Sequence, residues 1–333
     1  MSDPVARLST ALEGRYAIRV LVTVACMAAW SVPTAQAQQQ ITDRWSRMAD
    51  MNEPHEYHGA VAVDGKIYVV GGNTYLSRES AAFEEFDPEA NTWRTLPEMP
   101  TRRELLGVAA IQNRIFAVGG ITVSGDAHAT VEAYDLTENT WTRVADLPTP
   151  RGWLAAVAVS GRIFAIGGMS MDESTGIVEV YDSDEDSWER RADMPTPRHG
   201  HSAVVVDGKI LVVGGHRLEG NLLRLSTVEE YDPVTDRWTV KADMPTPRAF
   251  LGLAVAKGYV YAFAGRLPRS APPVERYNPE ANTWEPLGTM PEGFRNRFGI
   301  ATVNDMIYVL GGEFQGDAQT PVSVLRYEPE DGR

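Results

Sequence analysis

Three histidines, His199, His201 and His216, are the residues in this chain best suited to bind a metal or to respond to pH. A two-residue hairpin turn at Asp207 and Gly208 would place His199 opposite His216 on the neighbouring strand. Zinc needs three or four ligands, and only two of these histidines converge clearly. We therefore expect a pH-sensitive or solvated pair without a bound metal.

The same hairpin register predicts one such pair in each of five related segments. These pairs are Glu56 with Asn73, Glu104 with Ile121, Gly152 with Met169, Ala249 with Arg266, and Asn296 with Glu313. One position after the first member of each pair come Tyr57, Leu105, Trp153, Gly200, Phe250 and Arg297.

Aromatic rings offer rigid contact area and charged groups fix a ligand's orientation, so these positions are suited to recognition. The alternative is that several of these residues only form the solvated rim of the channel and bind no ligand. The candidate ligand-binding residues are Glu56, Tyr57, Asn73, Glu104, Trp153, His199, His216, Phe250, Arg266, Asn296, Arg297 and Glu313.

The elements that must position these residues form a sixfold repeat. Its tryptophans recur at intervals of 46 to 50 residues, at Trp45, Trp93, Trp141, Trp188, Trp238 and Trp284. Each copy also has a Gly-Gly pair, degenerate in one copy as Ala264-Gly265, and an aromatic residue after it. In the five complete copies a Trp follows this aromatic residue by seven positions. Short apolar runs separated by turns predict four antiparallel strands per copy.

Four strands in about 48 residues are typical of one propeller blade. Over residues 41–330 the pattern resembles the kelch family, which implies an all-β, six-bladed propeller. We expect a domain over residues 38–333, with blades near 55–99, 103–147, 151–194, 198–244, 248–290, and 295–333 together with 41–49. The segment around Trp45 repeats the sequence of a fourth strand, so the N-terminal strand should close the sixth blade.

Loop lengths indicate which face carries function. Each Trp stands 27 or 28 residues before the second Gly of the next pair, whereas that Gly stands 12 to 16 residues before the next aromatic. In a meander these variable loops share one face with the crossovers between blades, so we expect binding there, at the mouth of the central channel. In protein-binding kelch domains the corresponding two positions of the first strand contact peptides. The resemblance therefore points to the same residues around the channel mouth.

Other repeated residues are interpreted as structural. Arg103, Arg151, Arg198, Arg248 and Arg295, with His55 in the first copy, recur at one position, which favours a role between blades. The repeated Trp and Tyr residues are expected in the core.

The N-terminus resembles an export signal. Arg15 and Arg19 precede an apolar run over residues 20–32, and the Ala-Gln-Ala sequence at 35–37 is a cleavage signal. We expect residues 1–37 to be removed after Ala37 and the protein to be periplasmic or secreted, without a membrane span. A lipoprotein acylated at Cys26 is the less favoured alternative. Cys26 is the only cysteine, so the mature chain would have no disulfide.

The net charge of −14 opposes nucleic-acid binding. We favour a monomeric binding module, without cofactor or metal, that recognises a protein segment or a glycan. The alternative is a sugar isomerase resembling the bacterial sialic-acid mutarotase, with Glu104, Arg297 and Glu313 as catalytic groups. A copper site like that of galactose oxidase is excluded for the mature chain, because it needs a Tyr–Cys crosslink. No P-loop, zinc-protease motif or nucleophile elbow occurs.

Overall fold

The computed structural model describes residues 44–74, 79–122, 124–170, 173–219, 221–266, 273–291, 295–314 and 322–330. The chain divides into two units, Met1–Val32 and Pro33–Arg333, and all described residues belong to the second. The predicted signal peptide and its cleavage site lie outside them. Within the described segments there is no helix long and apolar enough to cross a membrane.

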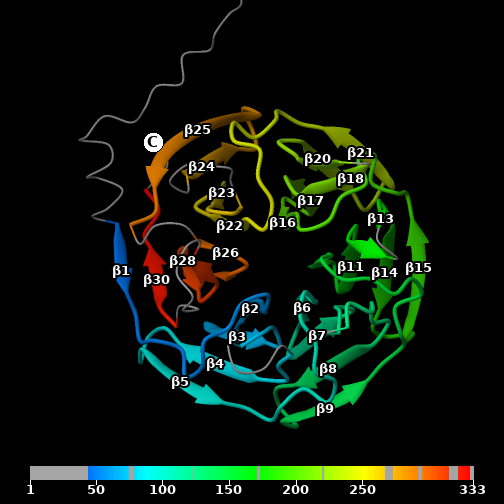
Figure 1. Ribbon diagram of the computed structural model, residues 1–333, viewed down its shortest axis with the longest axis vertical. Coiled ribbons are helices and arrows are strands. Elements are labelled where there is room, and N and C mark those ends of the chain that lie inside the picture. The colour runs from blue at the N-terminus through cyan, green and yellow to red at the C-terminus, as the bar shows by residue number, and fades with distance from the viewer. Residues whose placement is uncertain are drawn as a thin grey trace, which may run out of the picture. The chain divides into compact units, whose positions relative to one another are not determined.

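The described residues form six four-stranded antiparallel sheets arranged as a ring (Figure 1). The first three, from the innermost strand outward, are β2 (Gly59–Val63), β3 (Lys66–Val70), β4 (Phe83–Asp87) and β5 (Thr92–Thr95); β6 (Gly107–Ile111), β7 (Arg114–Val118), β8 (Val131–Asp135) and β9 (Thr140–Arg143); and β10 (Ala155–Val159), β11 (Arg162–Ile166), β14 (Val178–Asp182) and β15 (Ser187–Arg191).

The next two sheets are β16 (Ser202–Val206), β17 (Lys209–Val213), β20 (Val228–Asp232) and β21 (Arg237–Val240); and β22 (Gly252–Ala256), β23 (Tyr259–Phe263), β24 (Pro273–Asn278) and β25 (Thr283–Thr289). The sixth contains β27 (Gly299–Val303), β28 (Met306–Leu310), β30 (Val324–Tyr327) and β1 (Trp45–Arg47). The predicted six-bladed β-propeller is confirmed, and we number the blades one to six in this order.

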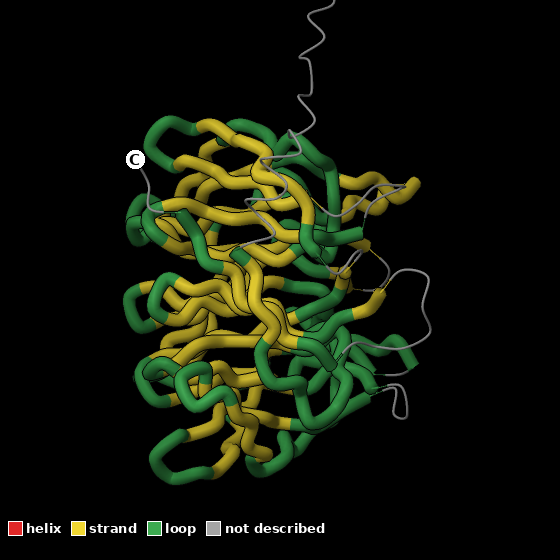
Figure 2. Tube along the Cα trace, turned by 90° about the vertical axis from the view of Figure 1, so that its left-hand side faces the viewer, coloured by secondary structure: helices red, strands yellow, loops and turns green. Residues whose placement is uncertain are grey.

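Three small strand pairs lie in the connections: β12 (Met169–Ser170) with β13 (Glu173–Ser174), β18 (His216–Glu219) with β19 (Asn221–Arg224), and β26 (Arg295–Asn296) with β29 (Glu313–Phe314). Viewed edge-on, the sheets carry short turns on one side and longer loops on the other (Figure 2). The short turns include Asp207 and Gly208, whose φ angles of 50° and 76° suit a two-residue hairpin.

The hydrophobic core is divided among the interfaces between neighbouring blades. One cluster joins Val70 and Phe83 of blade one to Ile115 and Tyr134 of blade two, and five other clusters repeat this arrangement around the ring. The second strand of each blade is apolar along most of its length because blades cover both of its faces. Each blade is therefore stabilised chiefly by its two neighbours.

The N-terminal strand closes the ring, as predicted. Strand β1 pairs with β30, with Trp45 opposite Tyr327. The Trp45 ring also meets the edge of Phe263 in blade five, at a centroid distance of 5.7 Å. Both ends of the described chain thus contribute to the sixth blade and to its interface with the fifth.

The tryptophans lie less deeply than predicted. The repeated tyrosines such as Tyr181 and Tyr231 are fully buried, but the tryptophans are half-buried because they belong to the outermost strands. Except at Trp45, their indole N–H groups bond to the preceding blade; Trp238 Nε1, for example, donates to the carbonyl of Ala192 at 3.0 Å. They pack against the hydrophobic clusters and also link neighbouring blades, so their predicted place in the core is confirmed in part.

The repeated arginines are fully buried and have two structural roles. Each side chain lies in its own blade; four of them pair with a glutamate of the third strand, as in Arg198–Glu229 at 2.7 Å and Arg248–Glu275 at 2.8 Å. Each backbone carbonyl accepts a hydrogen bond from the second glycine of the preceding blade. The predicted role between blades therefore holds for the backbone, whereas the side chain acts within one blade.

Two blades depart from this arginine–glutamate pattern. In blade one His55 replaces the arginine and lies 3.6 Å from Glu84. In blade six the glutamate position is Leu325, and Arg295 donates instead to the carbonyls of Gly311 and Ser323. Burial lowers the pKa of Arg248 to about 10 although Glu275 opposes the shift, so this guanidinium stays charged at neutral pH.

The substitution Arg198→Met should strongly destabilise the protein, because it leaves the buried Glu229 carboxylate without its cation. Breaking a buried pair in this way costs about 3–5 kcal/mol. The double variant Arg198→Met/Glu229→Leu, which imitates the leucine of blade six, should regain part of this loss. Urea unfolding midpoints measure both effects, and a double variant less stable than the single one would contradict this account.

Candidate functional site

Six backbone pairs surround the start of the innermost strands, and all six follow the predicted register. They are Glu56 with Asn73, Glu104 with Ile121, Gly152 with Met169, His199 with His216, Ala249 with Arg266, and Asn296 with Glu313. The pairing is set by the two-residue turn at the far end of each hairpin, so residue numbers alone were sufficient to predict it.

The next position in each blade forms a ring. Tyr57, Leu105, Trp153, Gly200, Phe250 and Arg297 all have left-handed backbones, with φ between 52° and 62°. This region is unfavourable for residues other than glycine, and five of the six are not glycine. Five backbone hydrogen bonds of 2.7–3.0 Å hold the ring, running from the N–H of one member to the carbonyl of the preceding member.

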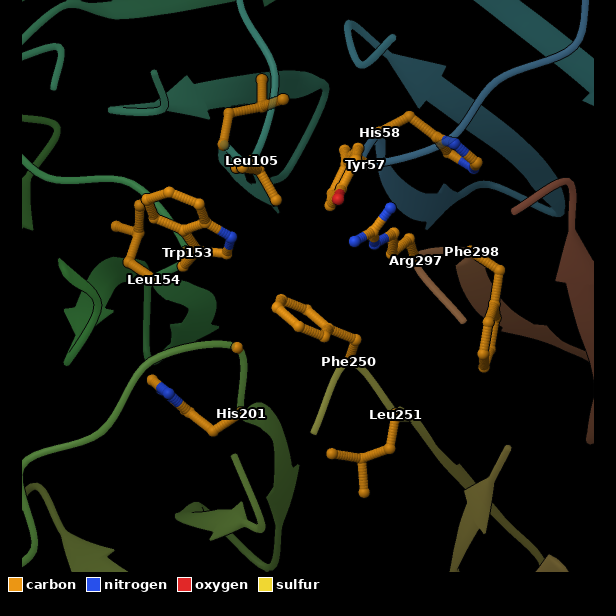
Figure 3. A pocket seen from close by; sticks show the side chains of 12 residues that line it. Tyr57, His58, Leu105, Trp153, Leu154, His201, Phe250, Leu251, Arg297 and Phe298 are labelled. Atoms are coloured by element: carbon orange, nitrogen blue, oxygen red, sulfur yellow. The ribbon is translucent and has the colours of Figure 1, made fainter. Parts of the chain in front are cut away.

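A small axial cavity lies inside this ring. Its volume is about 120 Å³, and it is lined by the six ring residues and by the residues that follow them, among them His58 and His201. The side chains of Tyr57, Trp153, Phe250 and Arg297 converge on it from separate blades (Figure 3). Because the backbone is nearly the same in every blade, the side-chain types alone make the cavity asymmetric.

Aromatic rings make a continuous wall along one side of the mouth. Centroids lie 6.0 Å apart between Trp153 and His199, 5.5 Å between His199 and His216, and 5.4 Å between His216 and Phe250. Phe250 then meets Tyr57 edge to face at 6.5 Å. Such a wall offers rigid apolar contact area.

Among the described residues that line the axial cavity, Arg297 is the only lysine or arginine. Its guanidinium carbon lies 4.3 Å from the centre of the Tyr57 ring and 5.9 Å from that of Phe250. One guanidinium nitrogen lies 3.7 Å from a carboxylate oxygen of Glu56, and both side chains remain about one-fifth exposed. Arg297 is thus pre-oriented between an aromatic face and a carboxylate while it still meets solvent.

The histidine pair is buried, so its interpretation as a solvated pair was wrong. The Ser174 hydroxyl accepts a hydrogen bond from the N–H of Leu218 and lies 2.8 Å from Nδ1 of His199. Burial lowers the pKa values of His199 and His216 to about 4. Both rings are neutral at pH 7, and their response to pH is displaced into the acid range. Among the described residues, no three His, Cys, Asp or Glu side chains gather to hold a metal.

The remaining predicted residues lie around the ring rather than at its centre. Asn296 is buried, whereas Asn73, Glu104 and Arg266 are half-buried. Glu313 pairs with Asn296 through its backbone, and its side chain is outside the description. Of the two candidate catalytic groups whose side chains are described, Arg297 lines the axial cavity and Glu104 does not, and one carboxylate beside Arg297 is that of Glu56.

Sequence reasoning missed three contributors. His58 and His201 line the cavity one position beyond the ring, at the repeat position that carries leucine in blades two, three and five. This exchange of leucine for histidine was visible in the repeat. Ser174 supports His199 from the connection of blade three, and nothing in the repeat indicated that contact.

These features define a six-bladed propeller with a cavity on its axis. A family model described as the KLHDC2/KLHL20/DRC7 Kelch-repeats domain matches residues 36–194 and 146–312. Together these matches cover most of the chain, which belongs to the Kelch-repeat family.

Two individual proteins agree with this assignment. Human Kelch-like protein 11 is 38% identical over 60 residues, which are 18% of this chain and 8% of that protein's length. The solved structure named "Structure of YjhT" matches with a TM-score of 0.74 at 15% identity, covering 86% of this chain and 98% of that chain. This second likeness shows a shared fold.

Replacing both cavity histidines with leucine should reduce the acid sensitivity of the protein. Burial lowers the pKa values of His58 and His201 from 6.5 to about 3, so below pH 6.5 the unfolded chain binds protons that the folded chain does not. Stability is therefore lost as pH falls from 6.5 towards 3, by about 1.4 kcal/mol per pH unit for each histidine.

Urea midpoints between pH 7 and pH 4.5 test this expectation. The variant His58→Leu/His201→Leu should show a flatter decline than the wild type, because leucine already occupies this position in three blades. Parallel declines in the two proteins would show that these histidines do not cause the acid sensitivity.

Proposed function

We propose that this protein is an exported binding module that recognises a segment of another protein at the axial mouth. The observation that carries the proposal is the ring of left-handed residues, which directs Tyr57, Trp153, Phe250 and Arg297 into one cavity from separate blades. Membership of the Kelch-repeat family supports a protein partner, because kelch propellers commonly bind proteins.

The chemistry of the mouth supports recognition in two ways. Trp, Tyr and Arg are the residue types that most often dominate binding energy, and all three occur in this ring. The strained backbone and its hydrogen bonds hold the side chains in place before a ligand arrives, which reduces the entropy lost on binding. Arg297 offers a charge-assisted contact to an acidic or carbonyl group, and the aromatic rings take up apolar surface.

Export rests on the N-terminal sequence. We propose that residues 1–37 are removed and that the propeller acts in the periplasm or outside the cell. The intact mass of the exported protein should correspond to a chain that begins at Gln38 and contains no thiol. A mass that retains Cys26 with an attached lipid would establish the lipoprotein instead.

Substitutions in the ring should abolish binding without unfolding the protein. Trp153→Ala and Arg297→Ala should each weaken the binding of a ligand selected from a peptide and glycan panel by about 30-fold or more, equivalent to about 2 kcal/mol. Calorimetry measures the affinity, and thermal unfolding checks the fold. Arg237→Ala is the matched control, because Arg237 is exposed on the outermost strand of blade four.

Other outcomes of the same panel would redirect the proposal. Selection of glycans alone would replace the protein segment with a carbohydrate. Ligands that bind equally well to the Arg297→Ala variant would place recognition elsewhere.

The close pair of Arg297 and Glu56 is the observation that favours the isomerase alternative, since a carboxylate beside a cation suits proton transfer during ring opening. NMR-monitored anomerisation of sialic acid and other sugars, tested with wild type, Glu56→Gln and Glu104→Gln, separates that activity from binding alone.

A further inference from the structure

A second and larger pocket lies beside the axial cavity. It has a volume of about 580 Å³ and is formed where the loops of blades two and three meet. Trp153 lines both the pocket and the axial cavity, so this one side chain separates two hollows. The volume falls within the range of pockets that enclose small ligands or several side chains.

The walls of this pocket are apolar and fixed. Pro148 and Pro150 line it with restricted backbones, and the hydroxyl of Thr149 between them donates to Glu179 at 2.7 Å. The Thr149 carbonyl accepts a hydrogen bond from Arg151 at 2.9 Å. These contacts hold the hydroxyl and the carbonyl of Thr149 in place.

Two further apolar walls are anchored by backbone pairing. Ile121 pairs with Glu104 and with Ala127, and Met169 pairs with Gly152, the residue before Trp153. The N–H of Trp153 donates to the carbonyl of Leu105 at 2.9 Å, so the indole is attached to the same hydrogen-bonded frame. The pocket is therefore preformed.

One charge defines the chemistry of the pocket. Among the described residues that line it, Asp126 is the only ionisable one. Its side chain is exposed, and one carboxylate oxygen accepts a hydrogen bond from the Ser124 hydroxyl at 2.6 Å. The turn is further held by the N–H of Asp126, which donates to the Thr122 hydroxyl at 3.2 Å. A fixed carboxylate thus stands beside an apolar, aromatic pocket in a protein of net charge −14.

We propose that this pocket takes a lysine or arginine side chain of the bound protein segment. The aliphatic stem would lie along the proline, isoleucine and methionine walls, and the cation would meet the Asp126 carboxylate and the Trp153 ring. An acidic side chain would meet like charge here, and a purely apolar one would gain no contact from the carboxylate. The net charge of the protein also favours the approach of a basic segment.

This inference rests on the proposed function, because it names the chemistry of a segment that continues over Trp153 into the axial mouth. The two sites nevertheless contain different charged groups, Asp126 in the pocket and Arg297 on the axis. They can therefore be tested separately.

The experiment uses two small probes, Nα-acetyl-lysine methylamide and its uncharged analogue Nα-acetyl-norleucine methylamide. The protein is labelled with 5-fluorotryptophan, and the ¹⁹F signal of Trp153 is assigned by its loss in Trp153→Phe. Titration of the wild type should shift this signal at a concentration of the lysine probe about three- to tenfold lower than that of the norleucine probe. In Asp126→Asn, which retains the acceptor for Ser124, this preference should disappear.

Two control variants make the outcome decisive. Asp184→Asn removes an exposed carboxylate from a turn on the opposite face and should leave the lysine preference unchanged. Arg297→Ala should also leave the lysine preference unchanged while it weakens the binding measured for the proposed function. The inference about the pocket and the proposed function can therefore fail independently. Equal shifts by both probes in the wild type, or a lysine preference that persists in Asp126→Asn, would overturn the inference.

Discussion

One hydrogen bond, repeated six times, determines where the site residues stand. The N–H of the second glycine in each blade donates to the carbonyl of the arginine position in the next blade, over 2.8–3.1 Å. The last of these bonds, from Gly312 to His55, closes the ring. A side chain at this glycine would not fit; a Cβ on Gly72, for instance, would lie 2.6 Å from the carbonyl of Glu56. Blade spacing and the position of the mouth both depend on this contact.

The repeat made most of the architecture predictable. Six copies with nearly constant spacing from Trp to Gly-Gly imply six equivalent blades, and the hairpin turns set every pair around the mouth. Burial was harder to predict. The same Trp position is half-buried because it lies on an outermost strand. His199 and His216 are buried, and side chains of the neighbouring blades lie against them. Such coverage depends on contacts between blades and loops that spacing within one copy does not encode.

The chemistry of the mouth comes from departures from the repeat. The ring position has one backbone conformation in all six blades, yet it carries Tyr, Leu, Trp, Gly, Phe and Arg in turn. The scaffold therefore fixes where each side chain begins, and each blade sets its chemistry independently. Gly200 illustrates the interdependence of neighbours, because a Cβ there would lie 2.7 Å from the Phe250 ring. The small residue of blade four makes room for the aromatic residue of blade five.

The buried arginines are connected to the residues at the mouth through the backbone. Each buried arginine immediately precedes a pair position, and its side chain is tied to its own blade while its carbonyl is tied to the preceding one. The crossover that leads to the mouth is therefore held at both blades before the chain turns into the left-handed ring. A buried ion pair contributes little net stability when compared with apolar packing. Its benefit here is positional, because it holds the crossovers behind the ring side chains in place.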